Sequence, residues 1–175
     1  MKMKRYFLLV IAFLALYISI AESAVTEPDG ALNLNWKDSP VTVQQKAERQ
    51  KWQLAEEISD PPASMFKQYK GRYLNERVDI YTYFTSDKLY MIWIFFNDIP
   101  ASNPLYKNIS SLLTNEHGAA SYEDTTTGAV WEMKNNLIAL NRTEKNAPTR
   151  LLYVYLPLNN EVVNNIPLEQ LYKNF

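Results

Sequence analysis

The chain has 175 residues, with 18 basic and 19 acidic side chains and a formal net charge of −1, so its charge does not favour nucleic acid as a partner. It contains no cysteine, which excludes disulfides, thiolate zinc sites and thiol nucleophiles. One histidine and four glycines leave little material for a catalytic triad or for a glycine-rich nucleotide loop.

Residues 1–21 predict a secretory signal peptide. The segment starts with three basic residues and continues as an apolar run to Ile20, and Ser19 and Ala21 suit the positions before a cleavage site. A second reading frame for cleavage uses Ala21 and Ser23. The alternative is an uncleaved anchor in the inner membrane, although the run is shorter than the roughly 20 residues of a spanning helix.

Cleavage after residue 21 leaves 15 basic and 19 acidic residues, a net charge of −4. The lysine-rich start indicates a bacterial chain, and we expect a periplasmic or secreted protein with no stable membrane insertion after cleavage. Residues 22–175 are enough for a single domain with its own core. Within them, polar residues 22–31 predict a flexible entry.

The first elements after this entry are predicted from spacing and from capping residues. Alternating apolar side chains over 32–36 indicate a short strand. Ser39-Pro40 suits a helix start, with serine as the N-cap and proline at the first helical position. An apolar stripe predicts that this helix continues to Asp60, before Pro61. The stripe consists of Val43, Ala47, Leu54 and Ile58.

A strand over 65–74 is followed by a hairpin over 78–96 with Ser86-Asp87 at its tip. A regular hairpin would pair Phe84 with Leu89 and Ile80 with Trp93. Its second face would then carry tyrosines and aliphatic side chains. This face is a candidate binding surface, because tyrosine is enriched in interfaces. The alternative is that a helix covers the face and the tyrosine hydroxyls reach its rim. The candidate binding residues are Tyr81, Tyr83, Tyr90 and Ile92.

The second half repeats the same alternation of helix and hairpin. Asn103-Pro104 opens a helix that Gly118 ends, and a hairpin over 129–141 turns at Asn135-Asn136. A strand over 150–156 and a short helix from 165 to 174 complete the chain. The predicted fold is α+β: antiparallel β-meanders separated by a helix, with the helices packed on one sheet face as a two-layer sandwich.

Four segments of the chain carry a resemblance. They are "YFTSDKLYMIWIFF", a helix ending "LLTNEHG", "WEMKNNLIALNR" and "LLYVYLPL". Over roughly residues 65–157 the chain resembles small exported bacterial α+β domains of unknown function. His117 stands where that pattern has an aromatic residue before Gly118. The resemblance implies a fold and an exported location, and it implies no activity.

Candidate catalytic and metal-binding groups are few. His117, with Glu123 and Asp124 nearby in sequence, is the alternative metal site, but a histidine in the last helical turn also suits the helix dipole. Basic residues between 67 and 77 suit either an anionic ligand or an edge strand protected from pairing. The sequence therefore predicts no cofactor and a non-enzymatic binding module that uses an aromatic sheet face or an edge strand to bind another envelope protein. The alternative is a small periplasmic hydrolase with an unrecognised carboxylate site.

Overall fold

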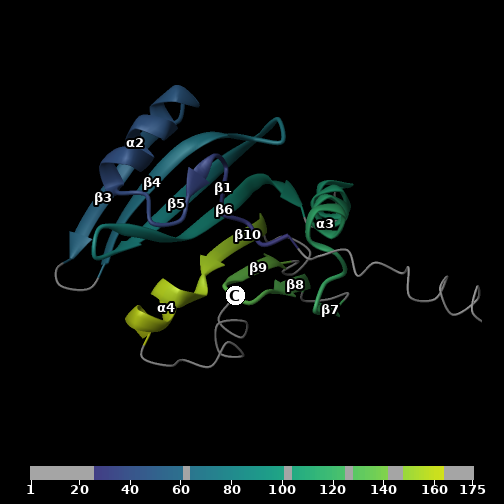
Figure 1. Cartoon of the computed structure of the whole chain (residues 1–175). Coiled ribbons are helices and arrows are strands. Elements are labelled where there is room, and N and C mark those ends of the chain that lie inside the picture. Colours follow the sequence, from purple (N-terminus) through teal and green to yellow (C-terminus); the bar gives the residue numbers. More distant parts are fainter. Residues whose placement is uncertain (1–25, 61–63, 101–103, 125–127, 142–147, 164–175) are drawn as a thin grey trace, which may run out of the picture.

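The structure is a computed structural model that describes residues 26–60, 64–100, 104–124, 128–141 and 148–163 (Figure 1). Most of these residues belong to one eight-stranded antiparallel sheet, in the strand order β3-β4-β5-β6-β10-β9-β8-β7. A second sheet has two strands, and three short helices complete the described part. This mixture of antiparallel sheet and helices confirms the expected α+β content.

The elements follow one another in the order β1 (Gly30–Ala31), β2 (Leu34–Asn35), α2 (Pro40–Arg49), β3 (Gln53–Asp60), β4 (Ser64–Tyr73), β5 (Glu76–Thr85), β6 (Lys88–Pro100), α3 (Pro104–His117), β7 (Tyr122–Asp124), β8 (Gly128–Glu132), β9 (Asn136–Asn141), β10 (Pro148–Tyr155) and α4 (Leu156–Val163). Helix α4 directly continues β10 and was not predicted. The helix expected over 165–174 lies outside the described residues.

Helix α2 begins as predicted and ends earlier than predicted. The Ser39 side chain accepts a hydrogen bond from the backbone N–H of Thr42 at 3.2 Å, and Pro40 is the first helical residue. The helix ends at Arg49, because Lys51 adopts a left-handed conformation with φ 60°. The prediction that it continues to Asp60 was wrong: residues 53–60 form strand β3 and pair with β4.

The β5–β6 hairpin turns at Ser86 and Asp87, whose φ angles of 47° and 58° are those of a tight two-residue turn. Phe84 pairs with Leu89 as expected, but Tyr83 pairs with Met91. Tyr90 is therefore one extra residue, a β-bulge. Beyond it the predicted register was wrong by one residue, and such a slip exchanges the two faces of a strand.

The β8–β9 hairpin also differs from the predicted register, but its faces are retained. Trp131 pairs with Ile138 rather than with Leu140, because the turn centres on Lys134 and Asn135. The shift amounts to two residues in the partner strand, and side chains two apart share a face. Trp131, Met133, Ile138 and Leu140 are accordingly all buried, as expected.

Two clusters of buried side chains lie on opposite faces of the sheet. The main cluster includes Ile80 and Ile94 of the sheet, Val43 and Ala47 of α2, and Ile109 of α3. The second cluster is smaller and consists of Leu137, Leu152, Val154 and Leu156. Leu156 is the first residue of α4. Helices α2 and α3 thus contribute side chains to the main cluster, whereas α4 contributes to the second cluster.

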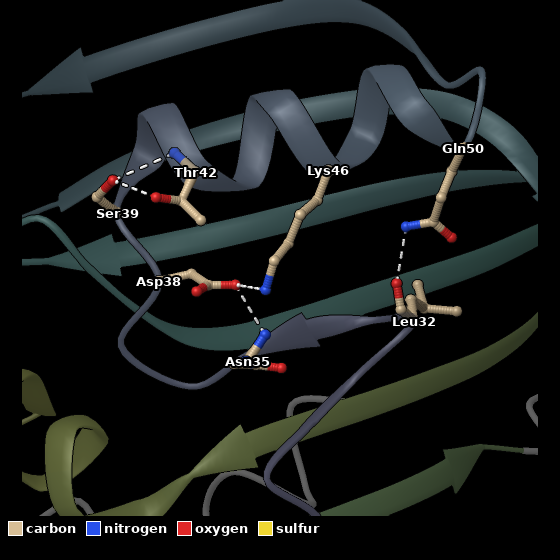
Figure 2. Close-up of polar contacts among 7 residues, drawn as sticks. All are labelled: Leu32, Asn35, Asp38, Ser39, Thr42, Lys46 and Gln50. Atoms are coloured by element: carbon tan, nitrogen blue, oxygen red, sulfur yellow. Dashed lines mark hydrogen bonds and ion pairs between the residues drawn. The ribbon is translucent and has the colours of Figure 1, made fainter.

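The segment before α2 is tied to several elements, although a flexible entry was expected as far as residue 31. Both carboxylate oxygens of Glu27 accept hydrogen bonds from Asn135, at 3.1 Å from its backbone N–H and 2.9 Å from its side chain. Lys46 contacts Asp38 at 2.6 Å, and the Gln50 side chain donates to the carbonyl of Leu32 at 2.8 Å (Figure 2). These contacts hold residues 27–38 against α2 and the β8–β9 turn.

Candidate interaction surface

Aromatic side chains gather on the sheet face opposite the main cluster. Cross-strand pairing sets Phe66 of β4 beside Tyr83 of β5, and Tyr81 of β5 beside Trp93 of β6. Neighbouring residues of these strands, such as Thr82 and Ile92, point to the main cluster's face and are buried. We call this set the aromatic patch; all its members are partly exposed, and they are Phe66, Tyr81, Tyr83, Met91, Trp93 and Phe95.

The rings of the aromatic patch contact one another across three strands. Phe66 lies 6.3 Å from Tyr81 and 5.7 Å from Tyr83 between ring centroids. Phe95 meets Tyr81 edge to face at 5.2 Å and lies 4.7 Å from Trp93. Aromatic pairs favour such tilted and edge-to-face arrangements. The patch is therefore one continuous surface of rings held on rigid strands.

Charged groups border the patch on two sides. The Arg150 guanidinium carbon lies 5.3 Å from the centroid of Phe95, a distance that allows a cation–π interaction. Burial, and then the negative charges of Asp79 and Glu56, raise the pKa of Tyr81 above its ordinary value. Burial likewise raises the pKa of Tyr83. Both tyrosines therefore stay neutral hydrogen-bonding groups at physiological pH.

The structure does not bring the four predicted binding residues together on one exposed surface. Tyr81 and Tyr83 belong to the aromatic patch, whereas Ile92 is fully buried in the main cluster on the other face. Tyr90 is only 5% exposed, and burial and the neighbouring Tyr83 raise its pKa. The physical reason is the bulge at Tyr90, which moves Met91, Trp93 and Phe95 to the face of Tyr81.

Sequence reasoning missed Phe66, Met91, Trp93 and Phe95 as members of this surface. The last three were placed on the buried face because a regular hairpin was assumed. After the bulge, residues 91–96 of β6 alternate between partly exposed and buried. The sequence of β6 is apolar at every one of these positions, so it does not indicate which residues point to which face. Phe66 pairs with Tyr83 in the observed register, which places it on the face of the tyrosines. The register between β4 and β5 had not been predicted, so this membership was missed.

His117 ends α3 and holds the N-terminal segment. Its Nδ1 atom lies 2.8 Å from the carbonyl oxygen of Thr26, which accepts the hydrogen bond, and only 8% of the residue is exposed. Gly118 follows with φ 84°, and its N–H donates to the carbonyl of Thr114. Across the described residues no group of three or more metal-ligating side chains comes together, so His117, Glu123 and Asp124 do not form a shared site there.

The basic residues between 67 and 77 do not lie on an edge strand. They belong to β4 and β5, with β3 paired outside β4. Lys67 is buried and contacts the Gln44 side chain at 3.0 Å and the Glu57 carboxylate at 3.2 Å. Lys67 therefore connects α2 to the sheet and is not available to an anionic ligand.

Comparisons with protein-family models, with curated proteins and with solved structures found no match for this chain. The resemblance to exported bacterial domains thus stays a prediction. Among the helices that the structure describes, none is long and apolar enough to cross a membrane.

Proposed function

We propose that this protein is a non-enzymatic binding module that holds a partner protein against the aromatic patch. The observation that carries the proposal is the continuous set of rings from Phe66 to Phe95, partly exposed and in mutual contact. Tyrosine, tryptophan and phenylalanine contribute large contact areas at a small entropic cost, and they are enriched in protein interfaces. Contiguous exposed apolar surface on a folded domain commonly marks an interaction site.

The arrangement of layers supports this proposal. In the finer architecture that we infer, α2 and α3 cover one sheet face as the second layer of a two-layer sandwich. Their side chains contribute Val43, Ala47, Leu105, Ile109 and Leu113 to the main cluster. On the other face, the buried residues of the second cluster lie on β9, β10 and the start of α4, and Met91 and Trp93 of β6 pack against them. Among the described residues, the aromatic patch on β4–β6 is only partly covered, and its exposed part can contact a partner.

Site-specific photocrosslinking tests the proposal. With a photoreactive phenylalanine derivative in place of Tyr81, irradiation of living cells should give a specific covalent adduct with another envelope protein. The matched control places the same derivative at Tyr122, a tyrosine that is 57% exposed on β7 at the far edge of the sheet. Adducts should be detected by immunoblotting and identified by mass spectrometry.

Two outcomes would contradict the proposal. One is the absence of any adduct from the Tyr81 position in cells that make the folded protein. The other is an identical set of adducts from Tyr81 and Tyr122, since that would show random encounter. A melting curve for each variant verifies that the replacement leaves the domain folded.

We propose further that the protein acts in the periplasm or is secreted, after removal of residues 1–21. The support is the basic start, the apolar run and the small residues Ser19 and Ala21. Mass spectrometry of the protein from the cell envelope should identify a chain that starts at or close to Glu22. Recovery of the intact N-terminus in the membrane fraction would instead indicate an inner-membrane anchor.

A further inference from the structure

Within the described part of the chain, no further strand pairs with the outer side of β3. β3 has eight residues and is the terminal strand of the sheet as the described residues define it. Every residue from 53 to 58 is exposed. The opposite edge is β7, which has only three residues. Because an edge strand presents unpaired backbone N–H and C=O groups, β3 is much the better template for an added strand.

The side chains of β3 give this edge a chemical character. Glu56 pairs in register with Gln68 and Ile58 with Phe66, so both project on the face of the aromatic patch. Ile58 is 41% exposed and extends the apolar surface from Phe66 to the edge. Glu57 points to the other face, where it forms an ion pair with Lys67. No ion pair to Glu56 is found within the described ranges, and its negative charge remains for a partner.

A second copy of this chain suits the edge poorly. In a symmetric antiparallel pair of β3 strands, opposite residues must share a face, so a pair centred on Glu56 sets this residue opposite Glu56 of the other copy. Like charges directly opposite one another destabilise a strand pair. The bulge between Leu54 and Glu56 also interrupts regular pairing near the start of the strand. The regular, acidic stretch from Glu56 onward instead favours a partner strand that carries positive charge.

We propose that β3 accepts an extended segment of the partner protein as an added strand, with a basic side chain beside Glu56 and an apolar side chain two positions away beside Ile58. This inference rests on the proposed function, because the added strand lies next to the aromatic patch and continues its surface. Main-chain hydrogen bonds supply the affinity of such strand addition, and the alternate side chains supply the specificity.

The probe for this inference is the acetylated and amidated peptide Thr-Lys-Thr-Val-Thr-Lys-Thr. Its valine can lie beside Ile58 with a lysine beside Glu56 in either strand direction, because the sequence reads the same both ways. Titration into the purified exported protein should shift the backbone amide NMR signals of β3 and slow their hydrogen exchange. A peptide that is N-methylated at every residue has no backbone N–H on either edge, cannot donate the ladder hydrogen bonds and should leave the β3 signals unchanged.

Charge variants test the role of Glu56. Glu56→Gln should weaken binding of the lysine peptide by about two- to five-fold, the effect of one exposed ion pair. Glu56→Lys should reverse the preference toward the corresponding peptide with glutamate in place of lysine. The matched control is Glu123→Gln, which removes an exposed glutamate from the opposite edge strand and should leave binding unchanged.

Several results would overturn the added strand. They are an absence of β3 shifts, equal binding of the N-methylated peptide, or equal effects of Glu56→Gln and Glu123→Gln. Concentration-dependent shifts of β3 without peptide would show that a second copy occupies the edge. If crosslinks from Tyr81 persist while the peptide fails, the aromatic patch binds its partner without strand addition. If those crosslinks also fail, the proposed function itself is wrong.

Discussion

Replacement of Ile92 by alanine should lower the free energy of unfolding by about 2–5 kcal/mol, the usual cost of deleting most of a buried isoleucine side chain. Ile92 has no exposed surface and belongs to the main cluster, on the face opposite the aromatic patch. Such a loss is a large share of the roughly 5–15 kcal/mol that stabilises a domain. Chemical denaturation followed by tryptophan fluorescence measures the change.

The neighbouring substitution Met91→Ala is the matched control for the bulge at Tyr90. Met91 is partly exposed on the other face, so its truncation should cost clearly less than that of Ile92. A regular hairpin without the bulge would bury Met91 on the face of the main cluster and place Ile92 on the opposite face. A larger loss from Met91→Ala than from Ile92→Ala would therefore show that the register across Tyr90 is incorrect.

Replacement of Trp131 by alanine should cost about 3–5 kcal/mol, because it removes a large buried aromatic side chain. Trp131 is only 2% exposed, and its indole N–H donates a hydrogen bond to the carbonyl of Gly118 at 3.0 Å. The side chain thereby connects β8 to the residue that follows α3. Thermal and denaturant unfolding should both report the loss, and the aromatic patch on the other face should keep its crosslinking behaviour if the domain remains folded.

The variant Trp131→Phe separates the two contributions of this residue. Phenylalanine keeps most of the buried apolar area but cannot donate to Gly118, so the expected loss is about 1 kcal/mol from the hydrogen bond together with a smaller packing change. A melting temperature for Trp131→Ala equal to that of the unchanged protein would mean that Trp131 does not lie in the core.

Local signals in the sequence were sufficient for the start of α2, the β5–β6 turn and the end of α3. Ser39 caps α2 as predicted, Ser86 and Asp87 form the hairpin tip, and Gly118 ends α3. Each of these features depends on residues within about four positions in the chain, which is why a sequence pattern can indicate them. The buried faces of β8 and β9 were also correct, because the error in register was an even number of residues.

Only two of the six residues of the aromatic patch were predicted. Tyr81 and Tyr83 were identified from alternation in β5, where polar and apolar side chains mark the two faces. In β6 both faces are apolar, so alternation carried no information on which residues point outward. Ile92 was consequently placed on the wrong face, and Trp93 and Phe95 were missed.

The sequence by itself determined that the protein is a cysteine-free α+β chain with an aromatic central hairpin and caps that divide it into elements. Only the tertiary structure decided that residues 53–60 form an edge strand and that Tyr90 is a bulge. The apolar spacing of residues 53–60 suited a helix, but these residues pair with β4, and this pairing satisfies their backbone groups instead. The phase of β6 was likewise set by its contacts with β5 and β10, because the register of a strand is a property of its neighbours as well as of its own residues.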